Sequence, residues 1–257
     1  MESATMVETP SLTVEGVTVT YGTFPVLDDV TFEAERGTLM GVVGPNGAGK
    51  STLFNAIAGL LPVDDGRISV RGKSDNGRAA LAYVPQREKV NWRFPVTVHD
   101  VVMLGRHGYT RWLRWPGSRD REFVRECLER VGMWVHRSDL MTELSGGQRQ
   151  RVFVARALAQ EADVLLLDEA FSGVDVGAQE GLVEVLRALC GEGKIVLMAT
   201  HDLTNMAQRF DRVLCLNHHV CAYGPPSAAF TPEVLEELYG AHGVDFAGNL
   251  EDHGHGH

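Results

Sequence analysis

The sequence has few cysteines and lacks long apolar runs. Only four of its 257 residues are cysteines, none of them in a Cys-x-x-Cys pair: Cys127, Cys190, Cys215 and Cys221. Such usage is typical of a reducing compartment rather than of a disulfide framework. No apolar run reaches the roughly 18 residues of a membrane-spanning helix, and residues 1–10 contain no basic stretch of a signal peptide. We therefore expect a cytoplasmic chain.

Positive charge is also scarce. Lys and Arg number 24 against 34 Asp and Glu, which gives a formal net charge of −10. Because the phosphate backbones of nucleic acids bind to clusters of positive charge, this balance argues against a nucleic-acid partner. The charge is uneven, however, since residues 87–121 contain eight basic and three acidic residues and three of the four tryptophans. This stretch indicates either a surface for an acidic or lipid-adjacent partner, or a solvated face over core tryptophans.

Hydrophobic periodicity predicts an α/β protein. Residues 11–20 alternate apolar and polar with a phase shift at Gly16, and residues 26–32 continue the β pattern, which predicts an antiparallel β portion with a bulge. The apolar runs 39–43, 164–167 and 195–199 alternate with helical patterns over 148–160 and 178–189. This alternation is typical of a parallel sheet with crossover helices.

The same patterns suggest a division of one domain over residues 1–257. Residues 11–85 would hold the antiparallel portion and the start of the core, with a polar linker at 64–67 before a strand from Ile68. Residues 86–144 have helical spacing and would form an inserted lobe, and residues 145–240 would complete the core. Thr231 and Pro232 predict the start of a last helix. Residues 241–257 would be a flexible tail that contains His253, His255 and His257.

A glycine-rich stretch directly follows the apolar run 39–43 and precedes a helical segment that ends near Gly59. Its residues are Gly44, Pro45, Asn46, Gly47, Ala48, Gly49, Lys50, Ser51 and Thr52. Glycines let backbone N–H groups turn toward a polyphosphate, and the helix N-terminus adds positive charge. Lys50 can reach the β and γ phosphates, and Ser51 can ligate Mg²⁺. The stretch therefore predicts a nucleoside triphosphate site.

Two carboxylates end the apolar run 164–167. Because open α/β sheets place ligands at the carboxyl ends of their strands, Asp168 and Glu169 are expected beside the triphosphate. Asp168 can hold Mg²⁺ through water. Glu169 can then act as the base, or as the group that orients the attacking water.

Taken alone, the next motif predicts only the start of a helix; its residues are Ser145, Gly146, Gly147 and Gln148. Ser145 with Gln148 three residues later is a capping box. Together with the phosphate stretch, however, the run 144–148, LSGGQ, resembles the signature of the ATP-binding cassette (ABC) family. The resemblance implies a RecA-like parallel-sheet core, an N-terminal antiparallel β subdomain and an inserted helical lobe.

The resemblance also implies roles for residues in four further motifs. An aromatic at Tyr21, followed by Val26, would contact adenine. Gln86 would sense Mg²⁺ and couple to a membrane permease, Asp175 would lie in a loop at a dimer interface, and His201 would contact the γ-phosphate. The catalytic set would be Glu169, His201, Lys50 and Gln86, with Mg²⁺ near Ser51, Gln86 and Asp168. The chain departs from the family at Ala170, where proline usually follows the glutamate.

In that family two copies enclose two ATP molecules, so the resemblance implies that Ser145, Gly146 and Gly147 face the phosphate loop of a second copy. Hydrolysis would then open the dimer. Stretches within residues 86–114 and at 171–175 resemble importers of manganese, zinc and chelated iron, with manganese favoured. This implies a peripheral ATPase at the cytoplasmic face of the membrane, a separate permease and an extracytoplasmic metal-binding protein. The alternative is a soluble ABC ATPase of an assembly pathway, such as iron–sulfur cluster biogenesis.

Two histidine-containing segments could bind metal themselves. His253, His255 and His257 alternate with glycine and indicate either a metal-binding tail or a disordered, solvated end. Cys215, His218, His219 and Cys221 surround a predicted tight turn, but nothing in their spacing enforces a tetrahedral zinc site.

Overall fold

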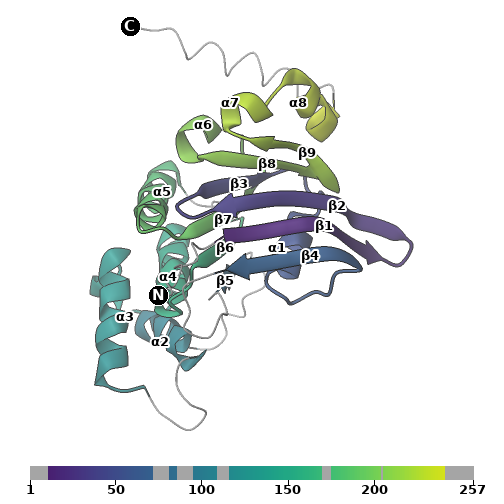
Figure 1. Ribbon diagram of the computed structural model, residues 1–257. Helices are drawn as coiled ribbons and strands as arrows, with labels where there is room; N and C mark the ends of the chain where they lie inside the picture. The colour runs from purple at the N-terminus through teal and green to yellow at the C-terminus, as the bar shows by residue number, and fades with distance from the viewer. Residues whose placement is uncertain are drawn as a thin grey trace, which may run out of the picture.

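The computed structural model describes residues 11–71, 81–85, 95–108, 116–169, 175–203 and 205–240. Two sheets make up the β structure of these residues. One has the order β2-β1-β4 and the other β5-β6-β7-β3-β8-β9. Figure 1 shows helices α2 and α3 at one end of the molecule and helices α7 and α8 at the other. The α/β class predicted from the sequence is confirmed.

The smaller sheet is antiparallel, as predicted. It contains β1 (Ser11–Tyr21), β2 (Phe24–Glu35) and β4 (Asp65–Arg71), and the β1–β2 register shifts between Val14 and Val17, where the bulge was expected. The polar linker predicted at residues 64–67 is wrong, because β4 already begins at Asp65. An edge strand tolerates these polar residues, since one of its faces meets solvent. There Arg67 pairs with Glu15 at 2.7 Å.

The larger sheet has a fully buried centre. Strands β3 (Leu39–Val43), β6 (Val164–Asp168) and β7 (Ile195–Thr200) are parallel, and every one of their residues is buried. Strands β5 (Leu81–Val84) and β8 (Arg212–Asn217) flank them in parallel, and β9 (His219–Gly224) adds an antiparallel edge. Continuous apolar runs are expected where both faces of a sheet are covered.

Each face of the larger sheet supports its own hydrophobic cluster. Alternate residues of β6 divide between them, with Leu166 on one face and Leu165 and Leu167 on the other. The first cluster includes Phe54 of α1 (Lys50–Ile57) and the apolar face of the antiparallel sheet. The second includes residues of α4 (Gly146–Ala159) and α5 (Val176–Gly191). Helix α1 is therefore fixed between the two sheets, directly after β3.

The helical lobe packs on α4. It contains α2 (Val98–Met103), the 3-10 turn η2 (Leu104–Gly108), α3 (Ser118–Arg130) and the 3-10 turn η3 (Trp134–His136). Val124, Cys127 and Leu128 of α3 are buried in the same cluster as α4, as their helical spacing predicted. Trp92, Trp112 and Trp115 lie outside the described residues, so the predicted surface of cations and aromatics stays a prediction.

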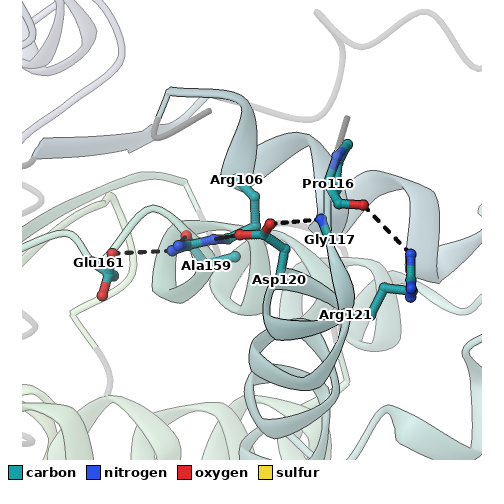
Figure 2. Close-up of polar contacts among 7 residues, drawn as sticks. All are labelled: Arg106, Pro116, Gly117, Asp120, Arg121, Ala159 and Glu161. Atoms are coloured by element: carbon teal, nitrogen blue, oxygen red, sulfur yellow. Dashed lines mark hydrogen bonds and ion pairs between the residues drawn. The ribbon is translucent and has the colours of Figure 1, made fainter. Parts of the chain in front are cut away.

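Arg106 joins this lobe to the core (Figure 2). Its Nε donates to Oδ1 of Asp120 at 3.2 Å, and one terminal nitrogen donates to the Ala159 carbonyl at 2.9 Å and to Oε2 of Glu161 at 3.1 Å. The Arg106 side chain is only 13% exposed. Burial alone would lower its pKa, but hydrogen bonds to Glu161 and Asp120 raise it overall. One of the eight basic residues counted in 87–121 thus serves an internal contact.

Short helices complete the C-terminal part. Helix α8 (Pro232–Tyr239) begins at the predicted residue, where the Val234 N–H donates to Oγ1 of Thr231 at 3.4 Å. Helices α6 (Met206–Arg209) and α7 (Pro226–Ala229) were not predicted. With four residues each, they are too short for a periodic hydrophobic signal.

We predict that Arg106→Ala lowers the free energy of unfolding by about 2–3 kcal/mol, because Asp120 and the Ala159 carbonyl lose a charged donor in a mostly buried setting. Arg121→Ala is the matched control. Arg121 is exposed and contacts the Pro116 carbonyl at 3.4 Å, so its loss is expected to cost less than about 0.5 kcal/mol. Urea denaturation measures both, and equal losses would contradict the anchoring role.

Candidate functional site

The loop between β3 and α1 wraps around the Lys50 side chain. Lys50 is the first residue of α1, and its Nζ donates to the carbonyls of Gly44 at 2.6 Å and of Pro45 at 2.9 Å. Gly49 precedes it with φ 97°, a left-handed conformation that favours glycine. The loop therefore holds its own cation at the helix N-terminus, where it adds to the positive end of the helix dipole.

The start of this loop lies against strand β8. A Cβ atom on Gly44 would approach the Leu216 carbonyl oxygen to 2.1 Å, so only glycine fits at this position. At the far side of the loop, the His218 N–H donates to the Ala48 carbonyl at 3.0 Å. The loop is thus fixed from both ends by β8 and by the turn that follows it.

Lys50 is 5% exposed, and its charge has two acidic neighbours. Burial lowers the pKa of Lys50 from its ordinary value, and the charges of Glu169 and Asp168 partly oppose that shift. An anion that entered the site would act in the same direction as these carboxylates and stabilise the ammonium form.

Asp168 ends strand β6 and is 2% exposed. Its Oδ2 accepts a hydrogen bond from the Tyr83 hydroxyl at 3.2 Å. Its Oδ1 is buried and has no hydrogen-bond partner among the described residues. A buried carboxylate oxygen left in this way is costly, and it is a suitable ligand for a hard divalent cation such as Mg²⁺. Burial and the Asp168 charge raise the pKa of Tyr83, which keeps its hydroxyl a donor.

Glu169, the next residue, has a strained backbone. Its φ is 51°, in the left-handed region that non-glycine residues rarely adopt, and its N–H donates to the Ala199 carbonyl of β7 at 3.1 Å. This conformation brings its Oε1 to 3.9 Å from Nδ1 of His201, the first residue after β7. The Glu169 side chain is 16% exposed and that of His201 is 55% exposed.

These groups surround one cavity of about 500 Å³. It is lined by Val26, Asn46, Gly47, Ala48, Gly49, Lys50, Ser51, Thr52, Glu169 and His201. The structure therefore brings together the phosphate loop, the carboxylate after β6 and the histidine after β7. The first two were expected from their positions at strand ends, and the histidine from the family resemblance. A cavity lined by a glycine-rich loop at a helix N-terminus, a buried cation, two hydroxyls and one carboxylate suits a polyphosphate with a divalent cation, although Asp168 is not among the lining residues.

Other candidate residues lie away from the cavity lining. Ser145 and Gln148 form the predicted capping box: the Gln148 N–H donates to Ser145 Oγ at 3.3 Å, and the Ser145 N–H donates to Gln148 Oε1 at 2.8 Å. Ser145 is exposed, and none of residues 145–148 lines the cavity of its own chain. Asp175 caps α5, where it accepts from the Ala178 N–H at 2.9 Å, and it does not line the cavity either.

Tyr21, at the end of β1, is 54% exposed and outside the cavity lining, whereas Val26 belongs to it. Gln86 and Ala170 lie outside the described residues, because the described ranges before them end at Pro85 and at Glu169. The roles given to Tyr21 and Gln86, and the effect of Ala170, therefore stay predictions.

Comparisons with known proteins show the family of the chain. The ABC transporter family profile matches residues 27–172. The chain is 46% identical over 228 residues, 88% of this chain and 86% of the relative, to the zinc transport system ATP-binding protein TroB of Treponema pallidum. It is also 46% identical to the manganese transport system ATP-binding protein MntA of Synechocystis, over 233 residues that cover 89% of this chain and 90% of the relative.

Solved structures share the fold. An inward-facing conformation of an ABC transporter assigned to the metal-chelate type aligns with a TM-score of 0.80 at 28% identity, covering 90% of this chain and 89% of that one. The dimeric structure of MJ0796, a bacterial ABC transporter cassette, aligns with a TM-score of 0.71 at 27% identity, covering 84% and 98%.

The strand-loop-helix junction, the cavity and the two sheets define a nucleotide-binding ATPase. With the family match over more than half its length and these relatives, the chain belongs to the ABC transporter family and is an ATP-binding ATPase. Among the described residues, no helix is both long and apolar enough to cross a membrane.

Sequence reasoning missed Tyr83. It lies on β5 and reaches Asp168 only because β5 pairs with β6 in parallel, with Tyr83 opposite Leu166. No local motif connects two residues that are 85 positions apart.

We predict that Tyr83→Phe lowers the free energy of unfolding of the nucleotide-free protein by about 1–2 kcal/mol, because Asp168 loses a donor in a buried setting. Tyr21→Phe removes a hydroxyl from an exposed ring and is expected to cost less than about 0.5 kcal/mol. Chemical denaturation of both variants tests this, and a Tyr83→Phe loss no larger than the control would show that the hydrogen bond contributes nothing.

Proposed function

We propose that this chain is the ATP-hydrolysing motor subunit of an importer for divalent transition metal ions, with manganese favoured over iron and zinc. One observation carries the proposal: the phosphate loop, Glu169 and His201 line a single cavity in a chain whose relatives include zinc, manganese and chelated iron transport proteins. The last of these, YfeB of Yersinia pestis, is 44% identical over 235 residues, 90% of this chain and 79% of the relative.

In this proposal the loop between β3 and α1 holds the phosphates. Residues 46–52 line the cavity, and their N–H groups would bind the phosphates. The Lys50 ammonium would neutralise the β and γ phosphates once they replace the Gly44 and Pro45 carbonyls as its partners. Ser51 Oγ and the buried Oδ1 of Asp168 would hold Mg²⁺, with Gln86 as a further ligand. Mg²⁺ held there would lower the negative charge of the phosphates.

Glu169 is proposed as the base. Its carboxylate lies in the cavity, mostly shielded from solvent, and its strained backbone fixes the direction in which it points. It would accept a proton from the water that attacks the γ-phosphate or orient that water. His201, at 3.9 Å from Glu169, would contact the γ-phosphate from the end of the neighbouring strand.

A second copy of the chain would complete the site. The cavity has an open side, and Ser145, Gly146 and Gly147 contribute nothing to it within one chain. Ser145, at the N-terminus of α4, is exposed, and the backbone N–H groups and dipole there would meet the γ-phosphate bound to another copy. The similar dimeric cassette supports this arrangement. Asp175 would lie at the same interface, and Tyr21 and Val26 would contact adenine.

The partners of the motor follow from its class. We propose a peripheral position at the cytoplasmic face of the membrane, with the permease bound through the helical lobe and the Gln86 region. An extracytoplasmic metal-binding protein would deliver the ion. The resemblance to a metal-chelate type transporter and the transport-system relatives favour this function over the soluble assembly ATPase.

We predict that Glu169→Gln reduces ATP hydrolysis at least ~10²-fold and accumulates an ATP-bound dimer, because binding stays intact while proton transfer fails. Size-exclusion chromatography with Mg²⁺ and ATP measures the dimer, and phosphate release measures turnover. Glu184→Gln, an exposed change on α5, is the control and is expected to behave as wild type. Wild-type turnover in Glu169→Gln would refute the base, and a monomer with bound ATP would refute the shared site.

We predict that the chain co-purifies in detergent with its co-expressed permease and that vesicles containing the complex take up radiolabelled manganese in an ATP-dependent manner. Iron and zinc are measured in parallel, and the Glu169→Gln complex is the inactive control. Uptake of zinc alone would overturn the manganese preference and leave metal import standing. Failure to bind the permease, with ATPase activity intact, would favour the soluble assembly pathway.

A further inference from the structure

A second group of metal-ligating side chains lies between β9 and α8, away from the nucleotide cavity. Nε2 of His219 is 2.7 Å from Oε1 of Glu237, and Sγ of Cys221 is 3.9 Å from Nε2 of His219. All three donor atoms lie within 4.8 Å of one another. Figure 1 shows β9 and α8 at the end of the molecule opposite α2 and α3.

We propose that His219, Cys221 and Glu237 form a binding site for a divalent transition metal ion of the thiophilic class typified by Zn²⁺. Thiolate sulfur, imidazole nitrogen and carboxylate oxygen are the usual zinc ligands. Zinc bonds of about 2.0–2.3 Å in a tetrahedron place ligand atoms roughly 3.3–3.6 Å apart, so side-chain rotation alone brings the three donors to one ion.

Rigid elements position the three ligands. His219 and Cys221 are two residues apart on β9, next to a register shift in its pairing with β8, and the 3.9 Å between Sγ of Cys221 and Nε2 of His219 shows that both side chains lie on the same side of the strand. Glu237 lies on α8, which packs on β8 and β9. The end of α8 is tied back to the hairpin, because Asn217 Nδ2 donates to the Glu237 carbonyl at 3.3 Å. Ligands held on packed elements lose little conformational entropy when an ion binds.

The charges of the three side chains and the solvent exposure of the site also suit a metal ion. A thiolate and a carboxylate would together neutralise the two positive charges of the metal, and imidazole adds a neutral donor. The side chains of His219 and Glu237 are 51% and 43% exposed, so the site is open to solvent and a water can supply the fourth ligand. Because the thiolate is the form that binds metal, an ion at this site would displace the Cys221 thiol proton, which is released to solvent.

The three proposed ligands are not the same as the four cysteine and histidine residues that lie near this turn in the sequence. Cys215 is fully buried in β8, and Nδ1 of His218 lies 3.2 Å from the Val26 carbonyl instead. The third proposed ligand is instead Glu237, which lies 16 residues after Cys221 in the sequence and is brought close by the packing of α8. The site is also separate from the Mg²⁺ site, because none of its residues lines the nucleotide cavity.

The experiment uses the full-length chain with His253, His255 and His257 changed to alanine, so that the tail does not bind the probe. Co²⁺ is titrated into the nucleotide-free protein under reducing, oxygen-free conditions, and thiolate-to-cobalt charge-transfer absorption is recorded. We expect the band to saturate at one equivalent and to disappear when Zn²⁺ is added. Mn²⁺ should not displace Co²⁺, since it binds N and S ligands more weakly.

Variants assign the ligands. Cys221→Ser should abolish the band, and His219→Ala and Glu237→Gln should each weaken Co²⁺ affinity at least ~10-fold, a loss of one ligand bond worth about 1.4 kcal/mol. Glu236→Gln, the exposed neighbour on α8, is the matched control and should bind as the parent does. A band that persists in Cys221→Ser, or its absence in the parent at large metal excess, would overturn the site. Displacement by Mn²⁺ as efficient as by Zn²⁺ would overturn the thiophilic class.

Discussion

Burial of both faces of the core sheet is the constraint from which the site follows. Strands β3, β6 and β7 are completely buried and parallel, so their carboxyl ends meet at one edge. A polar segment follows each strand at that edge, because polar residues are not accommodated in the apolar interior. The phosphate loop, the two carboxylates and the histidine are brought together by this packing alone, across more than 150 residues of sequence from Gly44 to His201.

The site concentrates charge that has little solvation. Lys50 and Asp168 are almost fully buried, and Glu169 is mostly shielded. Each charge is satisfied only in part: Lys50 by loop carbonyls, Asp168 by the Tyr83 hydroxyl on one oxygen. Groups arranged in this way gain most when a ligand of opposite charge arrives, since the desolvation cost is already met by folding. The nucleotide-free protein thus already holds the charges that we propose bind a polyphosphate and a divalent cation.

Local patterns predicted most of the fold, and contacts between distant segments were the part that they missed. The bulge near Gly16, the strand over 39–43 and the capping box at Ser145 each have a signal of a few residues, and the structure confirms them. Helices α6 and α7 are too short for periodicity, and β4 begins early because an edge strand accepts polar residues. Tyr83 and Glu237 reach their partners through strand and helix packing, which no spacing in the sequence encodes. The domain division and the roles at Gln86 and Asp175 stay predictions.

Helix α4 connects the residues proposed to meet a second copy of the chain with the anchor of the helical lobe. Ser145 begins it, and the carbonyl of Ala159 at its other end accepts the Arg106 hydrogen bond that holds the helical lobe. Its 14 residues span about 21 Å at the α-helical rise. A tilt of about 10° around the Arg106 end would carry Ser145 by roughly 4 Å, which exceeds the range over which a hydrogen bond survives. The length of α4 therefore amplifies a small tilt at one end into a displacement at the other end that is large enough to break a contact.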